Sequence, residues 1–176
     1  MRFVKYPLIA ILFFFLALLQ TSFLPHFSIM GAAPSLVFIF FFILVFNECL
    51  KRKFFNQEYY FALFLVVLAC LFLDIFSPFY FGLSIISLLG VYALVKTIMY
   101  FVREQRDRYF ILYFIGIFSF CFLANVAFLN LVSNNFHFRK YLYIELAYNV
   151  ALACIWFYIY KIIDNLVHRG KQLRLF

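Results

Sequence analysis

The chain has 176 residues, of which 68% are hydrophobic and only 12% charged, and its formal net charge is +8. A soluble domain has about a quarter of its residues charged and under half of them apolar. This composition excludes water-soluble globular folds, disordered tails and secreted disulfide scaffolds. It predicts an all-α integral membrane protein that crosses the bilayer several times.

Apolar runs bounded by charge, Pro or Gly predict six transmembrane helices within a single domain, residues 1–176. They cover approximately residues 6–24, 31–50, 59–78, 82–102, 109–131 and 141–163. The first run has no small-residue cleavage site after it, so we interpret it as a retained signal-anchor helix. The second is the weakest, because its uninterrupted core, Ser35 to Phe46, is too short to cross about 30 Å of hydrocarbon.

The basic residues predict the orientation, because short cytoplasmic loops carry an excess of Lys and Arg. With the amino terminus inside, the outer loops hold only Arg139 and Lys140, and all other Lys and Arg lie on the cytoplasmic side. Both termini are therefore expected in the cytoplasm. The positive charge is explained by anionic lipid beside the inner face, with no nucleic-acid partner. We define the basic cytoplasmic face as the charged residues of two loops: Lys51, Arg52, Lys53, Arg103, Arg106 and Arg108.

Polar side chains inside the predicted spans gather in their outer halves. They are Gln20, Asp74, Asn125, Asn130, Glu145 and Asn149, with Ser84 and Ser87 at the outer start of the fourth span. Two interpretations stay open: an outward polar concavity between helices, or a set of interhelical hydrogen bonds. Asp74 precedes a Ser77-Pro78 turn that leads to Gly82, so it either caps the next helix or contacts a ligand.

No catalytic motif appears in the chain. It has no H-E-x-x-H pair, no G-x-S-x-G elbow and no P-loop, and its histidines, His26, His137 and His168, fall in loops or the tail. The cysteines have no metal-ligand spacing. We therefore expect no catalytic residue, no metal and no cofactor, and we predict that the protein is not an enzyme.

Three places in the sequence resemble the rod shape-determining protein MreD family. Leu18 to Pro25, followed by Gly31 to Leu36, is similar to the first hairpin of the family. Leu73 to Ser77, followed by Phe81-Gly82-Leu83, resembles its Asp-Leu-like pair with a Gly shortly after it. Asn149 stands where members often carry an Asn, although the Pro that often follows it is absent here.

The resemblance implies a non-catalytic scaffold or regulatory subunit of the cell-wall elongation complex in the bacterial inner membrane. Its expected partners are an MreC-like single-span protein, RodA with a class B penicillin-binding protein, and MreB beneath the membrane. The implied fold is similar to that of the substrate-binding S-components of vitamin transporters. The candidate outer polar cluster and structural turn comprise Gln20, Asp74, Ser77, Gly82, Asn125, Glu145 and Asn149.

Two other functions are open. The first is a substrate-binding membrane subunit of a vitamin-type transporter, with an outer pocket made by Asp74, Ser84, Asn125, Glu145 and Asn149. The second function, which the sequence supports less well, is that of an intramembrane enzyme. Small residues allow close approach of helices, either of partner helices in the scaffold interpretation or, for most of these residues, of the protein's own six helices: Ala62, Ala69, Gly90, Ala93, Gly116, Ala147, Ala151 and Ala153.

Overall fold

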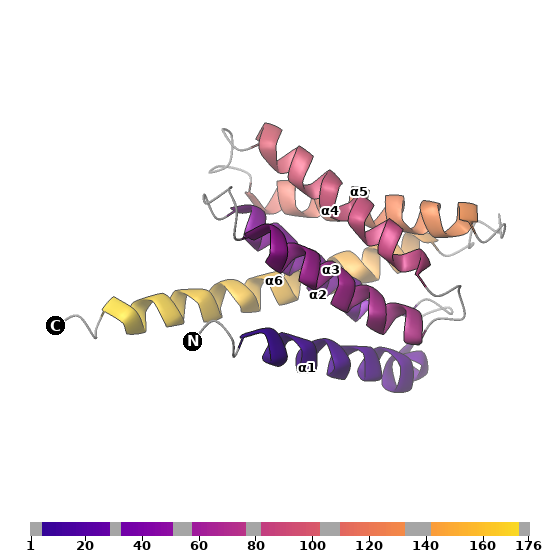
Figure 1. Ribbon diagram of the computed structural model, residues 1–176, viewed down its shortest axis with the longest axis horizontal. Helices are drawn as coiled ribbons and strands as arrows, with labels where there is room; N and C mark the ends of the chain where they lie inside the picture. Colours follow the sequence, from indigo (N-terminus) through magenta and orange to yellow (C-terminus); the bar gives the residue numbers. More distant parts are fainter. Residues whose placement is uncertain are drawn as a thin grey trace.

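A computed structural model describes residues 5–28, 33–50, 58–76, 82–102, 110–132 and 142–172, and the elements in these ranges are all helical (Figure 1). α1 (Lys5–Leu18) continues through a π-helical turn, η1 (Leu19–Phe23), into a 3₁₀ turn, η2 (Leu24–Phe27). The others are α2 (Leu36–Leu50), α3 (Glu58–Ile75), α4 (Leu83–Val102), α5 (Phe110–Val132) and α6 (Leu142–Gln172). The all-α prediction is confirmed for the described residues.

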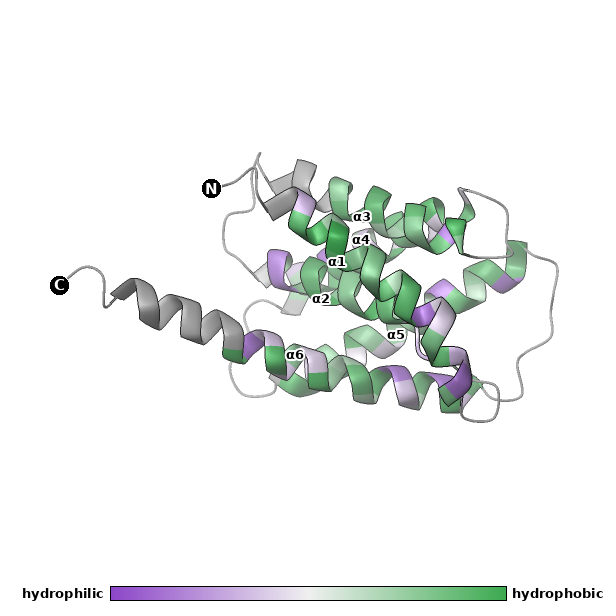
Figure 2. Ribbon diagram, turned by 90° about the horizontal axis from the view of Figure 1, so that it is seen from below, coloured by the Kyte–Doolittle hydropathy of each residue, from purple (hydrophilic) through white to green (hydrophobic). Residues whose placement is uncertain are grey.

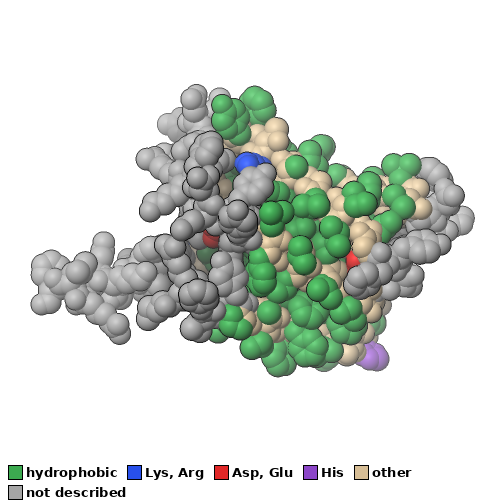
Figure 3. Space-filling model, viewed as in Figure 1, with side chains coloured by type: hydrophobic (Ala, Val, Ile, Leu, Met, Phe, Trp, Pro, Cys, Tyr) green, Lys and Arg blue, Asp and Glu red, His purple; other side chains and the backbone are tan. Residues whose placement is uncertain are grey.

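Four described helical segments are long and apolar enough to cross a membrane: Pro7–Phe27, Leu83–Phe101, Ile111–Val132 and Leu142–Ile162. Two further apolar helices are shorter, Leu36–Cys49 and Leu63–Ile75. Hydrophobic residues dominate the ribbon, and hydrophobic side chains cover most of the described surface on one face (Figures 2 and 3). Such surfaces are stable only in hydrocarbon, so the chain is a multi-pass membrane protein.

α2 is the central helix of the bundle. Its backbone lies against α1, α3, α4 and α6. Most of its side chains are fully buried, among them Phe38, Phe41, Phe42 and Phe46. At 15 residues it is about 22 Å long, since an α-helix rises about 1.5 Å per residue. The apolar side chains of α2 therefore pack mainly against neighbouring helices rather than against lipid.

α2 begins later than the run expected from residue 31. Ala33, Pro34 and Ser35 are not helical, and the first helical residue is Leu36. Ser35 acts as the amino-terminal cap, because its carbonyl oxygen accepts a hydrogen bond from the Ile39 N–H at 3.0 Å. The residue before a proline is disfavoured in the helical region, which places the boundary after Pro34.

Phenylalanine rings join α2 to α5. Three rings on each helix, spaced four residues apart and thus on one face, meet edge to face. The ring centroids are 5.6 Å apart for Phe38 and Phe122, 5.0 Å for Phe42 and Phe118, and 5.2 Å for Phe46 and Phe114. This aromatic seam packs the middle of the bundle with large rigid side chains and leaves its polar groups at the ends of the helices.

Candidate functional site

The six described helices or the turns that continue them all contribute residues to one cavity. These parts of the helices lie at the far end of the bundle, which we define as the end opposite both termini (Figures 1 and 2). There η1 and the last turns of α3 and α5 lie beside the first turns of α2, α4 and α6. We call this space the far-end cavity, and its volume is about 320 Å³. Its polar lining residues are Gln20, Thr21, Ser35, Ser84, Asn125, Asn130 and Glu145, and its aromatic ones are Phe38, Phe72, Phe76 and Phe122.

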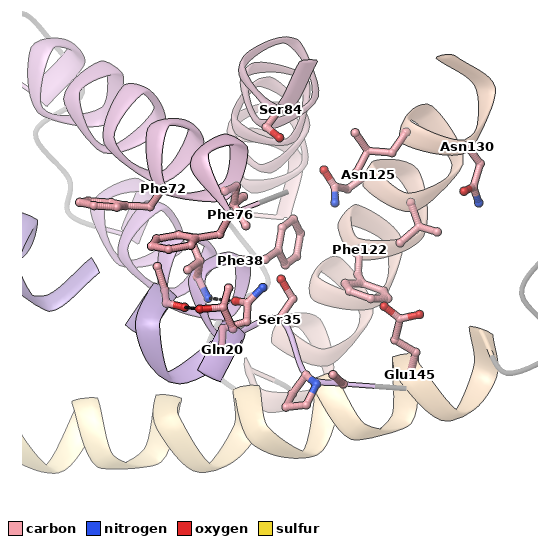
Figure 4. Close-up of a pocket in the computed structure, with 18 residues that line it drawn as sticks. Gln20, Ser35, Phe38, Phe72, Phe76, Ser84, Phe122, Asn125, Asn130 and Glu145 are labelled. Atoms are coloured by element: carbon pink, nitrogen blue, oxygen red, sulfur yellow. Dashed lines mark hydrogen bonds between the residues drawn. The ribbon is translucent and has the colours of Figure 1, made fainter. Parts of the chain in front are cut away.

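The first turn of α2 forms one wall of the far-end cavity and is capped by side chains from two other helices. The Val37 N–H donates to Gln20 Oε1 at 3.1 Å, a bond drawn in Figure 4. The Ser35 N–H donates to Asn149 Oδ1 at 2.8 Å. Amide groups in the first turn of a helix have no partner within that helix, and inside a membrane an unpaired one costs several kcal/mol. Gln20 and Asn149 therefore satisfy backbone groups that the helix itself leaves unpaired.

Each capping residue is held in place by its own helix. Asn149 is fully buried, and its Nδ2 donates to the Glu145 carbonyl oxygen one turn earlier, at 2.7 Å. Gln20 lies in the π turn η1, whose width is shown by the Leu24 N–H bonding to the Leu19 carbonyl, five residues back. Single π turns inside α-helices are rare and often occur at functional sites. Here the π turn carries the side chain that reaches α2.

Asp74 closes the turn between α3 and α4. It is 5% exposed, and its Oδ2 accepts a hydrogen bond from the Gly82 N–H at 2.7 Å. This contact is of the helix-capping kind, which is one of the two roles expected for Asp74 from the sequence. Gly82 has a φ of +95°, and its carbonyl accepts the Ile85 N–H that opens α4. The other carboxylate oxygen, Asp74 Oδ1, is buried without a hydrogen-bond partner. Asp74 does not line the far-end cavity.

A hydrogen bond between two side chains joins α4 to α5. The Ser87 hydroxyl donates to Asn125 Oδ1 at 2.5 Å. Asn125 and Ser84 both line the far-end cavity, whereas Ser87 does not. The structure thus divides the expected cluster. Gln20, Asn125 and Glu145 line the cavity, while Asp74, Gly82 and Asn149 form hydrogen bonds beside it.

The phenylalanine wall of the far-end cavity is the part that sequence reasoning missed. Phe38, Phe72, Phe76 and Phe122 line it, but with 30 Phe in the chain nothing in the sequence distinguishes these four.

Within the described ranges, no three His, Cys, Asp or Glu side chains lie close enough to hold a metal ion. Ser77 and the whole basic cytoplasmic face, Lys51, Arg52, Lys53, Arg103, Arg106 and Arg108, lie outside the described residues.

Comparisons of the chain with family models, with curated proteins and with solved structures found no match in any of the three.

Gln20→Met is expected to lower the free energy of unfolding by about 1–3 kcal/mol. It keeps the length of the side chain but removes the oxygen that accepts the Val37 N–H, and a buried donor without a partner costs about that much. The measurements are unfolding in SDS and hydrogen exchange of the first turn of α2, which should become faster. Leu19→Met, at a neighbouring residue that is 45% exposed, is the matched control. Equal stability of Gln20→Met and the wild type would contradict the capping role.

Two glycine substitutions on and beside α4 are expected to have opposite signs. Gly82→Ala should destabilise by about 1–2 kcal/mol, because its φ of +95° is costly for a residue with a Cβ. Gly90→Ala should stabilise by up to about 1 kcal/mol, because Ala is the better helix former. A Cβ at either position meets no atom within 4 Å, so steric clash affects neither result. Unfolding in SDS measures both, and destabilisation by Gly90→Ala would be the contrary outcome.

Proposed function

We propose that the chain is a non-catalytic, MreD-like scaffold or regulatory subunit of the bacterial cell-wall elongation complex. It lies in the inner membrane with six spans and both termini in the cytoplasm. It binds an MreC-like single-span protein and thereby controls cell shape and peptidoglycan synthesis. RodA with its class B penicillin-binding protein, MreB, and anionic lipid at the basic cytoplasmic face are the further partners.

One observation carries the proposal: the three segments that resemble the MreD family lie at the same end of the bundle, and a hydrogen bond joins the first to the third. Gln20 of the first hairpin bonds to α2, and Ser35 of the same hairpin bonds to Asn149, which is 114 positions away along the chain. Asp74 and Gly82 of the second segment bond to each other at the same end of the bundle. Each of these contacts is a hydrogen bond from a backbone N–H to a side-chain oxygen, and such bonds stabilise the packing of a helical bundle. The shared residues therefore support a common fold rather than a common reaction.

The positions of the small residues support a surface for partner helices. Ala69 and Ala153 are buried in the bundle, and the side chain of Ala62 is not described. The remaining five are exposed: Gly90 and Ala93 on α4, Gly116 on α5, and Ala147 and Ala151 on α6. Helices pair in lipid mainly by close packing at small residues, so α4 and α6 each offer a face for the span of an MreC-like protein.

We expect one of two double substitutions to reduce the recovery of a co-expressed MreC-like protein at least tenfold. The pairs are Gly90→Leu with Ala93→Leu on α4, and Ala147→Leu with Ala151→Leu on α6. Larger side chains prevent close approach of a partner helix. Ile111→Phe, at a residue that is 64% exposed on α5, controls for added bulk at the lipid-facing surface. Recovery is measured by affinity purification into nanodiscs, and depletion of the protein should make rod-shaped cells round.

The scaffold proposal is rejected if the two intact proteins fail to associate in nanodiscs. If both double variants bind the partner as the wild type does, the assignment of α4 and α6 as contact faces is wrong.

Fusions that report topology test the six spans. A fluorescent protein after residue 176 should be fluorescent, because it folds in the cytoplasm. Alkaline phosphatase fused within residues 133–140 should be active, because the positive-inside rule places that connection outside. Each reporter moved to the other position is the control. Phosphatase activity at the carboxyl terminus would overturn the orientation.

The far-end cavity favours a second candidate, a substrate-binding membrane subunit of a small-molecule transporter. A volume of about 320 Å³ is within the range of small-molecule sites. The neighbouring genes distinguish the two candidates. A gene for an MreC-like protein beside one for a penicillin-binding protein favours the scaffold, whereas an ATPase gene favours the transporter.

A further inference from the structure

The far-end cavity has one apolar side. Figure 4 shows Phe38 of α2, Phe122 of α5 and Phe76, the residue that follows α3, bordering the same space. Phe38 and Phe122 are almost completely buried, so their positions are fixed by packing. Rings held in this way contact an apolar or aromatic group without losing further conformational freedom. Such a wall, with a few placed polar groups opposite, is the usual composition of a small-molecule site.

The polar side of the cavity presents hydrogen-bond donors. Gln20 Oε1 already accepts the Val37 N–H, and Asn125 Oδ1 already accepts the Ser87 hydroxyl. The Val37 N–H can only donate, so its bond fixes the orientation of the Gln20 amide, and Asn125 turns its oxygen toward the Ser87 hydroxyl. The NH₂ groups, which carry two donors each, are left for another molecule. The Ser84 hydroxyl adds one more donor from α4 (Figure 4).

The charge of the lining argues against an anionic ligand. Glu145 is the one ionisable residue among the lining residues, and it is acidic. An anion would lie near this carboxylate with no Lys, Arg or His in the described lining to balance it. An ammonium group has donors and no acceptor, so it could pair with Glu145 but not with the amide NH₂ groups of Gln20 and Asn125. The group that fits these donors is an uncharged acceptor such as a carbonyl.

We propose that the far-end cavity binds a small uncharged molecule with a carbonyl or hydroxyl group at one end and an apolar or aromatic body. Asn125, Gln20 and Ser84 donate hydrogen bonds to its oxygen, and Phe38, Phe76 and Phe122 contact its body. This site goes beyond the scaffold function and does not depend on it.

Three probes of equal length test the head group: 4-phenylbutanamide, 4-phenylbutanoate and 4-phenylbutylamine. Tritiated amide is bound to the full chain in nanodiscs and measured by scintillation proximity, with empty nanodiscs as the control for partition into lipid. We expect saturable binding of the amide. The unlabelled carboxylate and amine should compete at least tenfold less well than unlabelled amide. Absence of saturable binding up to millimolar probe, or stronger competition by either ion, overturns the proposal.

Two pairs of variants locate the site. Asn125→Leu removes the donors at nearly constant volume and should weaken amide binding at least tenfold. Its control, Asn47→Leu, makes the same substitution on α2 at a residue that does not line the cavity, and should weaken binding less than threefold. Ser84→Phe fills the cavity and should abolish binding, whereas Ile86→Phe, at a residue that is 62% exposed on the same helix, should not.

If Ser84→Phe does not fold, the first pair still decides the question. Wild-type affinity in Asn125→Leu would place the probe elsewhere and overturn the assignment. Recovery of the MreC-like partner is measured on the same preparations. Loss of ligand binding is therefore separable from failure of the scaffold function.

Discussion

The rest of the bundle depends on one constraint, the need to satisfy the backbone amides at the start of α2 where water is scarce. α2 is short and central, and Val37, Phe38 and Ile39 in its first turn are buried among the other helices. Two side chains from opposite ends of the sequence, Gln20 and Asn149, supply the acceptors. Since every other helix packs on or near α2, these bonds fix the relative positions of α1, α2 and α6.

The same constraint explains why polar residues occur where they do. A very apolar chain retains amides and carboxylates only where a backbone group or another amide requires them. Asn149 and Asp74 each bond to a backbone N–H, and Ser87 ties α4 to Asn125. Because these bonds use acceptor oxygens, the amides that border the far-end cavity present donors to it. The architecture of the bundle thus determines the chemistry of the space it encloses.

Much of this arrangement could be predicted from the sequence, and its limits have physical causes. The apolar runs predicted where the helices lie, because length and composition are local properties. The gathering of Gln20, Asn125 and Glu145 followed from counting turns from the predicted ends. The partners of Gln20 and Asn149 could not be predicted, because they are backbone groups that any residue possesses. The π turn at Leu19–Phe23 has no composition that distinguishes it from an α-helix, so the direction of Gln20 was also beyond prediction.

The bond between Ser35 and Asn149 also makes the central helix depend on a segment that is synthesised later. α2 leaves the ribosome long before α6, yet one of the two side chains that cap its amino terminus is on α6, 114 positions later. Until α6 has been synthesised, the central helix therefore lacks one of its two tertiary caps. The bonds that hold α2 in the bundle are complete only when α6 packs against it.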